Sequence, residues 1–193
     1  MFVEAQLKAL MRDGARGAAR HEARNLVGSW RRFAAFAFVA EQYGYRYEGM
    51  AATSPKGSPN PYFGFRREAD AAERATLAAA RYPEGLRGGQ LPGMRPGRRR
   101  LRPSPEVREE VELLHARIQV DYARGHRRRG LIQVVVLPLA LLIPLSQFGF
   151  TAGPLLVCGG VWAFFVGLWG LGVLLSRRRL VKYGAVLRAA DRA

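Results

Sequence analysis

The most constraining feature of this sequence is a stretch of 47 residues, Gly130 to Ser176, that contains no Asp, Glu, Lys, Arg or His. Arginine triplets stand on both sides of it, at 127–129 and 177–179. About 20 helical residues cross a bilayer core about 30 Å thick, so the stretch is too long for one crossing and suits two. We therefore predict a two-span transmembrane hairpin over 130–176, with helices at about 131–148 and 154–176.

The charges around this hairpin predict its orientation, because arginines close to the ends of a span are retained in the cytoplasm. Both termini are then cytoplasmic. The chain has few lysines and abundant Ala and Gly, which is typical of GC-rich bacterial genes, so we expect the inner membrane of a bacterium. The arginines that set the topology and meet the lipid headgroups are Arg127, Arg128, Arg129, Arg177, Arg178 and Arg179.

The two predicted spans differ in their special residues. Pro138 and Pro144 each remove a backbone donor, so we expect kinks in the first span. The second span carries small residues at helical spacing, a ridge that lets another helix approach closely. That helix is either the first span or a second copy of the chain. The ridge consists of Gly159, Ala163, Gly167 and Gly170.

The rest of the chain is strongly basic. Lys and Arg number 31 against 15 Asp and Glu, which gives a formal net charge of +16. All of this charge lies outside the predicted hairpin, in residues 1–129 and in the tail 177–193. Such a charge implies an anionic partner, either a membrane surface or a nucleic acid, or else repulsion that is answered by counterions. Each arginine near an anionic leaflet gains about 1 kcal/mol of attraction, so the charge suits a membrane-bound protein.

Residues 1–129 divide into three predicted parts. Residues 1–82 form a basic, mainly helical cytoplasmic region, in which the alternation of Tyr43, Tyr45 and Tyr47 leaves open a small aromatic hairpin over 43–66. Residues 83–105 are rich in Pro, Gly and Arg and are predicted to be a linker. Residues 106–129 are predicted to be an amphipathic stalk helix. The basic residues of the linker are Arg95, Arg98, Arg99, Arg100 and Arg102.

The second half of the first 42 residues allows two interpretations. Trp30, Arg31, Arg32 and Phe33 combine aromatic and basic side chains, as expected of a helix that lies in the headgroup region. The alternative is an ordinary helix that packs on its neighbours, which the apolar residues from 35 to 40 favour.

The sequence contains no recognisable catalytic arrangement. Glu112 and His115 have the spacing of paired metal ligands on a helix, but no second such pair accompanies them. No phosphate-binding loop or dinucleotide fingerprint is present, and Cys158 falls within the second predicted span. We therefore expect no enzymatic activity and no metal or other cofactor.

Together these features predict an all-α membrane protein, a two-span helical hairpin with a basic, mainly helical N-terminal region. The expected function is a non-enzymatic anchor or scaffold that presents this region to the anionic inner leaflet and to a protein partner. In layout, residues 106–185 resemble two-span conflict-system effectors and some phage holins. That resemblance implies the first alternative, an oligomeric pore-forming or membrane-perturbing effector. A membrane-tethered nucleic-acid binder that uses the arginines from Arg87 to Arg102 is the second.

Overall fold

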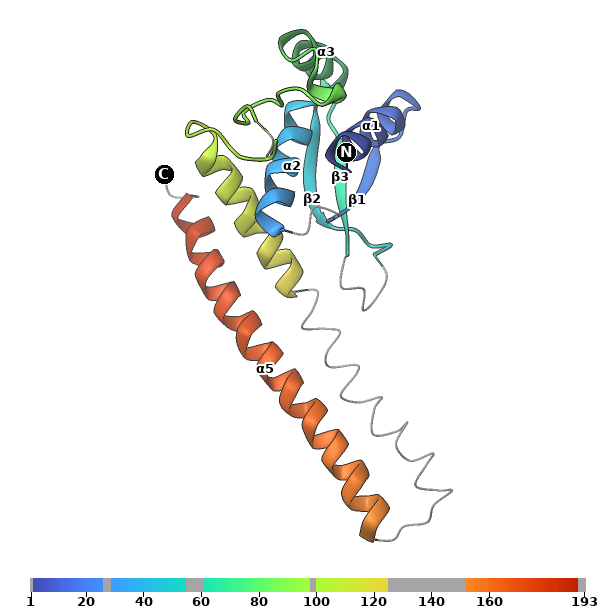
Figure 1. Cartoon of the computed structure of the whole chain (residues 1–193), viewed down its shortest axis with the longest axis vertical. Coiled ribbons are helices and arrows are strands. Elements are labelled where there is room, and N and C mark those ends of the chain that lie inside the picture. Colours follow the sequence, from blue (N-terminus) through green and yellow to red (C-terminus); the bar gives the residue numbers. More distant parts are fainter. Residues whose placement is uncertain (1, 26–28, 55–60, 98–99, 125–151, 191–193) are drawn as a thin grey trace.

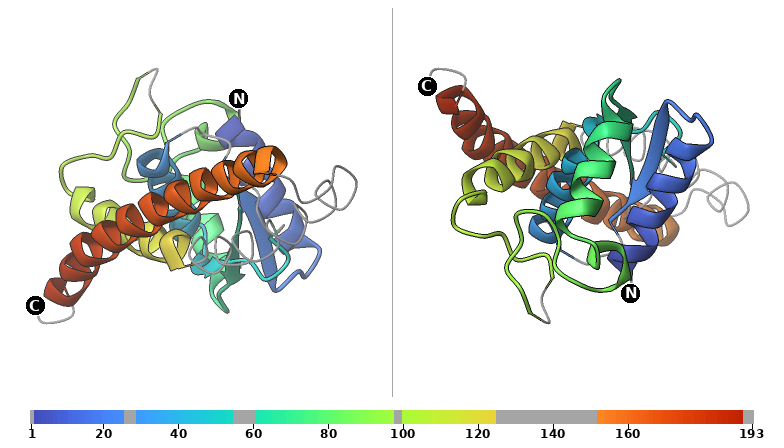
Figure 2. Two further views of the ribbon diagram at one scale, coloured as in Figure 1. Left: turned by 90° about the horizontal axis from the view of Figure 1, so that it is seen from below. Right: turned by 90° about the horizontal axis from the view of Figure 1, so that it is seen from above.

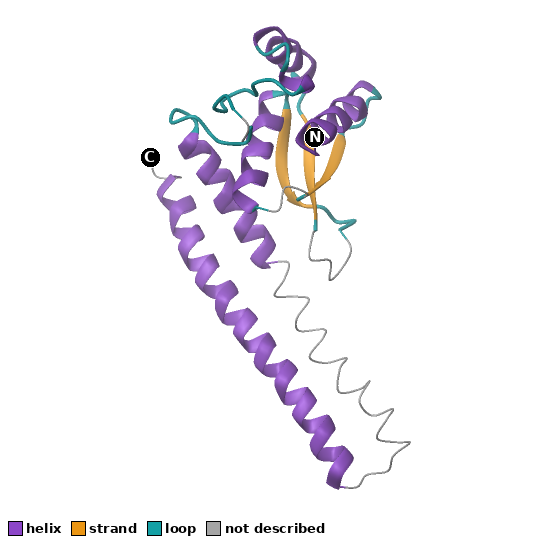
Figure 3. Ribbon diagram, viewed as in Figure 1, coloured by secondary structure: helices purple, strands orange, loops and turns teal. Residues whose placement is uncertain are grey.

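The computed structural model describes residues 2–25, 29–54, 61–97, 100–124 and 152–190. It shows a mixed α/β domain from which one long helix projects (Figures 1 and 3). In chain order, the elements are α1 (Phe2–Ala15), β1 (Arg20–Arg24), α2 (Trp30–Gln42), β2 (Tyr45–Met50), β3 (Tyr62–Arg67), α3 (Ala71–Arg81), the 3-10 helix η1 (Gly85–Arg87), a helix over 108–124 and α5 (Ala152–Ala190).

The three strands form an antiparallel sheet in the order β1-β3-β2. Arg20 lies opposite Arg66 in one pair, and Tyr45 lies opposite Arg67 in the other. Successive side chains of a strand point to opposite faces, and the sheet buries one of its two faces. The side chains buried on that face are His21, Ala23, Tyr45, Tyr47, Phe63 and Phe65.

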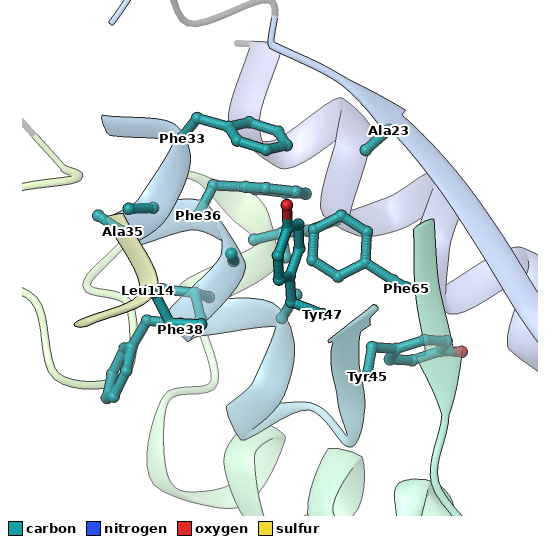
Figure 4. Packing of buried hydrophobic residues seen from close by; sticks show 14 of the residues in the cluster. Ala23, Phe33, Ala35, Phe36, Phe38, Tyr45, Tyr47, Phe65 and Leu114 are labelled. Carbon is teal, nitrogen blue, oxygen red and sulfur yellow. The ribbon is translucent and has the colours of Figure 1, made fainter. Parts of the chain in front are cut away.

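Helix α2 is enclosed on every side, because residues 33–40 are apolar and at most 3% exposed. One side of α2 packs on the sheet, where the ring centroids of Phe36 and Phe65 are 5.8 Å apart (Figure 4). On its other side lies the 108–124 helix (Figure 1), which contributes Val111, Leu114 and Ile118 to the same core. An apolar helix in the middle layer explains why its sequence is apolar nearly all round.

The turn from α2 into β2 requires glycine. Gly44 has a φ of +85°, and its N–H donates to the carbonyl of Glu41 at 2.9 Å, which closes the end of the helix. A Cβ on Gly44 would lie 2.3 Å from the Cα of Ala71, at the start of α3. The absence of a side chain therefore lets α3 pack directly against this turn.

The Pro, Gly and Arg-rich residues 83–105, predicted to be a linker, pack against the domain where they are described. Leu91 and Met94 are 1% and 2% exposed and belong to the core. The guanidinium of Arg100 donates to the carbonyls of Gly85 at 2.7 Å and Gly89 at 2.9 Å. Two buried apolar side chains and one arginine that binds loop carbonyls are sufficient to hold this segment in place.

The prediction of an all-α protein with a two-span membrane hairpin is wrong. The domain contains a three-stranded antiparallel sheet, and within the described residues one helix, α5, is long and apolar enough to cross a membrane. The first predicted span, 131–148, lies outside the described residues. Length and hydropathy of an apolar run do not determine how the chain before it folds, and β1 in particular has few apolar residues by which a strand could be recognised.

Candidate membrane interface

Helix α5 is the most exposed apolar element that the structure describes. From Leu156 to Ala190 this helix is long and apolar enough to cross a membrane, and its most apolar part is not buried against the rest of the structure. Large side chains on it are widely exposed, for example Leu156 at 77% and Phe164 at 64%. In Figure 1 this helix leaves the domain and runs well beyond it. Apolar surface of this extent indicates a partner or lipid that covers it.

The C-terminal part of α5 contacts the domain. The rings of His115, on the 108–124 helix, and Tyr183, on α5, meet edge to face with centroids 5.4 Å apart. His115 is 9% exposed, and burial together with the nearby Arg31 lowers its pKa, while Glu112 acts in the opposite direction. A neutral imidazole is therefore favoured at this contact. In both views of Figure 2, the end of α5 reaches past the edge of the domain.

This contact relates the domain to the boundary between the apolar and basic parts of α5. The two helices run in opposite directions (Figure 1), and each rises 1.5 Å per residue. Tyr122 follows His115 by seven residues, and Ser176 precedes Tyr183 by seven. Tyr122 and Ser176 therefore lie at a similar depth, about 10 Å from the contact. Ser176 is the last residue before the arginine triplet at 177–179.

The structure places the predicted ridge residues on an open surface. Gly159, Ala163, Gly167 and Gly170 are all exposed. A Cβ built on any of these three glycines meets no heavy atom within 4 Å. The ridge is therefore accessible to another helix as far as the described residues show.

The predicted topology residues are only partly described. Arg177 and Arg178 are exposed on α5, and Arg179 continues the same helix. The helix runs on to Ala190, through most of the predicted tail. The other residues predicted for topology and for kinks lie outside the described residues: Arg127, Arg128, Arg129, Pro138 and Pro144.

The residues of the predicted interfacial helix occupy the first turn of α2. Phe33 is fully buried in the core, whereas Arg31 and Arg32 are exposed. Trp30 is half-buried, with its ring 5.8 Å from that of Phe63 and 4.6 Å from that of Tyr122. The first turn of α2 thus has Phe33 in the core, Trp30 at the edge of the core and the two arginines in solvent.

The linker arginines have different environments. Arg95 and Arg100 border a cavity of about 290 Å³, but the guanidinium of Arg100 is used by the loop carbonyls described above. Arg95 is exposed, and its N–H donates to the carbonyl of Arg102 at 2.8 Å. Arg98 and Arg99 lie outside the described residues.

A buried polar contact that the sequence did not indicate joins the sheet to the 108–124 helix. The Tyr47 hydroxyl donates to Oδ2 of Asp121 at 3.0 Å, and the Tyr47 N–H donates to Oε1 of Glu41 at 3.3 Å. Burial raises the pKa of Asp121, of Glu41 and of the Tyr47 hydroxyl. The contact fixes the 108–124 helix against β2, close to the end that faces α5's apolar part.

Glu112 and His115, whose spacing alone matches paired metal ligands, interact with neighbours on their own helix. Nε2 of His115 lies 3.3 Å from the amide of Gln119, and Glu112 pairs with Arg108 at 3.3 Å. Within the described ranges, no group of three or more His, Cys, Asp or Glu side chains could hold a metal ion.

No family model matches this chain, and neither does any curated protein or solved structure.

Proposed function

We propose that this chain is a non-enzymatic membrane anchor, in which α5 crosses a bilayer and holds the α/β domain at the anionic face for a protein partner. The observation that supports this proposal is the exposed apolar surface of α5 from Leu156 onward, followed by the arginine triplet. In water, that surface would be far larger than the isolated apolar patches that monomeric proteins expose. In lipid, it is favourable at about 25 cal/mol per Å².

The orientation follows from the position of the domain. The domain contacts α5 beyond the arginine triplet, so it lies on the same side of the bilayer as the C-terminal end of the helix. Arginines at the end of a span favour the cytoplasmic side. We therefore propose the inner leaflet of a bacterial inner membrane as the surface against which the domain is held.

A cysteine in the middle of the span provides the test. Cys158 lies 18 residues before Ser176, about 27 Å along the helix, and is therefore close to the opposite headgroup level. In a Cys158→Ser background, Val166→Cys lies ten residues before Ser176, about 15 Å deep, and should resist a water-soluble maleimide in vesicles until detergent is added. The matched control in the same background is Ser176→Cys, which puts the thiol at the headgroup level and should react without detergent. Rapid labelling at position 166 in intact vesicles, or recovery of the full chain as a soluble monomer, would refute the anchor.

A second candidate function is self-association of the anchor, which the open glycine ridge favours. Gly159 and Gly167 present bare backbone on one face of α5, and close approach of two helices depends on such surfaces. An oligomer built in this way could act on the membrane itself, as a membrane-perturbing effector does. Depolarisation of cells on expression, lost when the ridge is filled, would favour this function over the simple anchor.

A further inference from the structure

We propose that the membrane-facing end of the α/β domain is itself a binding surface for anionic lipid headgroups, with Arg24, Arg31, Arg32 and Arg124 as its cationic groups. This inference rests on the proposed function, because it places α5 in the bilayer. It adds a second attachment: the domain binds the leaflet directly and is not merely suspended from the helix.

Four element ends meet at this surface. Arg24 ends β1 and lies opposite Tyr62, the first residue of β3. Trp30 begins α2, and its ring contacts Tyr122 near the end of the 108–124 helix. In Figure 1 these ends all lie on the side of the domain toward which the apolar part of α5 extends. The convergence brings these element ends to one end of the domain although they come from distant parts of the sequence.

This surface lies at the same level as the boundary between the apolar and basic parts of α5. Tyr122 and Ser176 are equally far, in residues, from the contact between His115 and Tyr183. When the apolar part of α5 lies in the hydrocarbon, Arg177 and Arg178 reach the headgroups, and the Tyr122 end of the domain lies at the same level. The domain can therefore bind the leaflet while its contact with α5 is kept.

Most of the cations at this end have no close carboxylate partner. Arg31, Arg32 and Arg124 are exposed, and none of them forms an ion pair with a described residue. Asp121, which accepts the hydrogen bond from Tyr47, does interact electrostatically with Arg124 and offsets part of its charge. The surface is still positively charged through Arg24, Arg31 and Arg32, which suits lipid phosphates and serine headgroups.

The aromatic side chains of the surface are also suited to the headgroup level. Trp30, Tyr62 and Tyr122 are each half-buried. The guanidinium of Arg24 lies over the Tyr62 ring, 4.3 Å from its centroid, and also donates to its hydroxyl. Tryptophan and tyrosine are enriched where apolar and aqueous surroundings meet.

The opposite end of the domain provides a matched control. Helix α3 lies at the end farthest from the apolar part of α5 (Figure 1), and Arg74 and Arg81 are exposed on it. Arg74 pairs with Asp70 at 2.7 Å. The double variants Arg31→Glu/Arg32→Glu and Arg74→Glu/Arg81→Glu change the net charge equally, so a difference between them reports position and not overall charge.

The experiment uses the full chain in phospholipid vesicles with Trp30 as the reporter. Trp162 and Trp169 are the other two tryptophans, and changing both to Phe leaves Trp30 alone. A quencher attached to lipid headgroups then measures the approach of Trp30 to the leaflet. We expect strong quenching in vesicles with phosphatidylserine and weak quenching in pure phosphatidylcholine, since each arginine contributes roughly fivefold to the preference for an anionic surface.

Arg31→Glu/Arg32→Glu should lower the docked population by at least about tenfold, and added salt should act in the same direction. In Arg74→Glu/Arg81→Glu, Trp30 should be quenched as strongly as in the parent chain. Equal quenching in both double variants, or in both vesicle types, would overturn the headgroup surface. Failure of the chain to remain with the vesicles at all would instead refute the anchor. Trp30 emission in neutral detergent checks that each variant is folded.

Discussion

Replacement of Tyr47 by Phe tests how the domain is joined to the helix that contacts its anchor. Tyr47 is 9% exposed, and its hydroxyl donates to Asp121 at 3.0 Å. A hydrogen bond to a charged acceptor contributes about 1.5–3 kcal/mol, and its loss leaves a half-buried carboxylate without that donor. We expect a destabilisation of about 2 kcal/mol. With a urea m-value of about 2 kcal/mol/M, the unfolding midpoint falls by about 1 M.

The pH dependence of this difference is a sharper check. Burial raises the pKa of Asp121, and the bond from Tyr47 opposes that rise. Without the bond, the folded-state pKa of Asp121 rises further above the unfolded value of 3.8. A raised carboxyl pKa means that the folded state binds the proton more tightly, so the variant gains stability relative to the parent as the pH falls toward that pKa. The deficit should therefore be largest near pH 7 and shrink on acidification.

The assay is urea unfolding of the full chain in neutral detergent, followed by Trp30 fluorescence with Trp162 and Trp169 changed to Phe. Tyr62→Phe is the control, because Tyr62 is half-exposed on the same sheet and should change stability by less than about 0.5 kcal/mol. A Tyr47→Phe effect as small as that of Tyr62→Phe, or one that does not depend on pH, would show that the contact does not join the two layers.

Three further changes test other parts of the structure. Phe36→Ala should cost about 3–5 kcal/mol in the same urea assay, against little for Leu77→Ala, which is 62% exposed; equal costs would contradict the core assignment. The lowered folded pKa of His115 means that stability present above pH 6.5 is lost as the pH falls below it. Acid should therefore reduce hydrogen-exchange protection of the last turns of α5, and His115→Gln should make that loss smaller. If His115→Gln responds to pH as the parent does, His115 is not the group responsible. Gly159→Leu with Gly167→Leu should reduce energy transfer between labelled copies in vesicles if the ridge is an interface, and undiminished transfer would exclude it.

Some elements could be predicted from local pattern. The alternation of Tyr43, Tyr45 and Tyr47 indicated extended chain at 43–66, where β2 and β3 pair. The amphipathic pattern of residues 106–129 likewise indicated a helix, and the structure has one over 108–124. By contrast, β1 could not be recognised, because its two buried residues are His21 and Ala23. That strand depends on pairing with β3, about 40 residues later, and such pairing has no local signal.

The candidate interface was predictable only where its residues follow one another along a single helix. Arg177, Arg178 and the ridge glycines follow from composition along one helix. The residues that meet at the domain end come from four elements, and the contact between Tyr47 and Asp121 joins residues 74 positions apart. In residues 83–105 the Pro, Gly and Arg content is typical of a linker, while two of its apolar residues, Leu91 and Met94, are buried in the core.

The enclosure of α2 has a consequence for how the anchor and the domain act together. The 108–124 helix covers the side of α2 that faces away from the sheet and contributes to the core that encloses residues 33–40. The same helix provides His115 for the contact with Tyr183 of α5. The element that completes the core is therefore also the element that meets α5. If α5 crosses a bilayer as we propose, this shared helix relates the orientation of the domain to that of the span, with the Trp30 end toward the lipid and α3 on the side of the solvent.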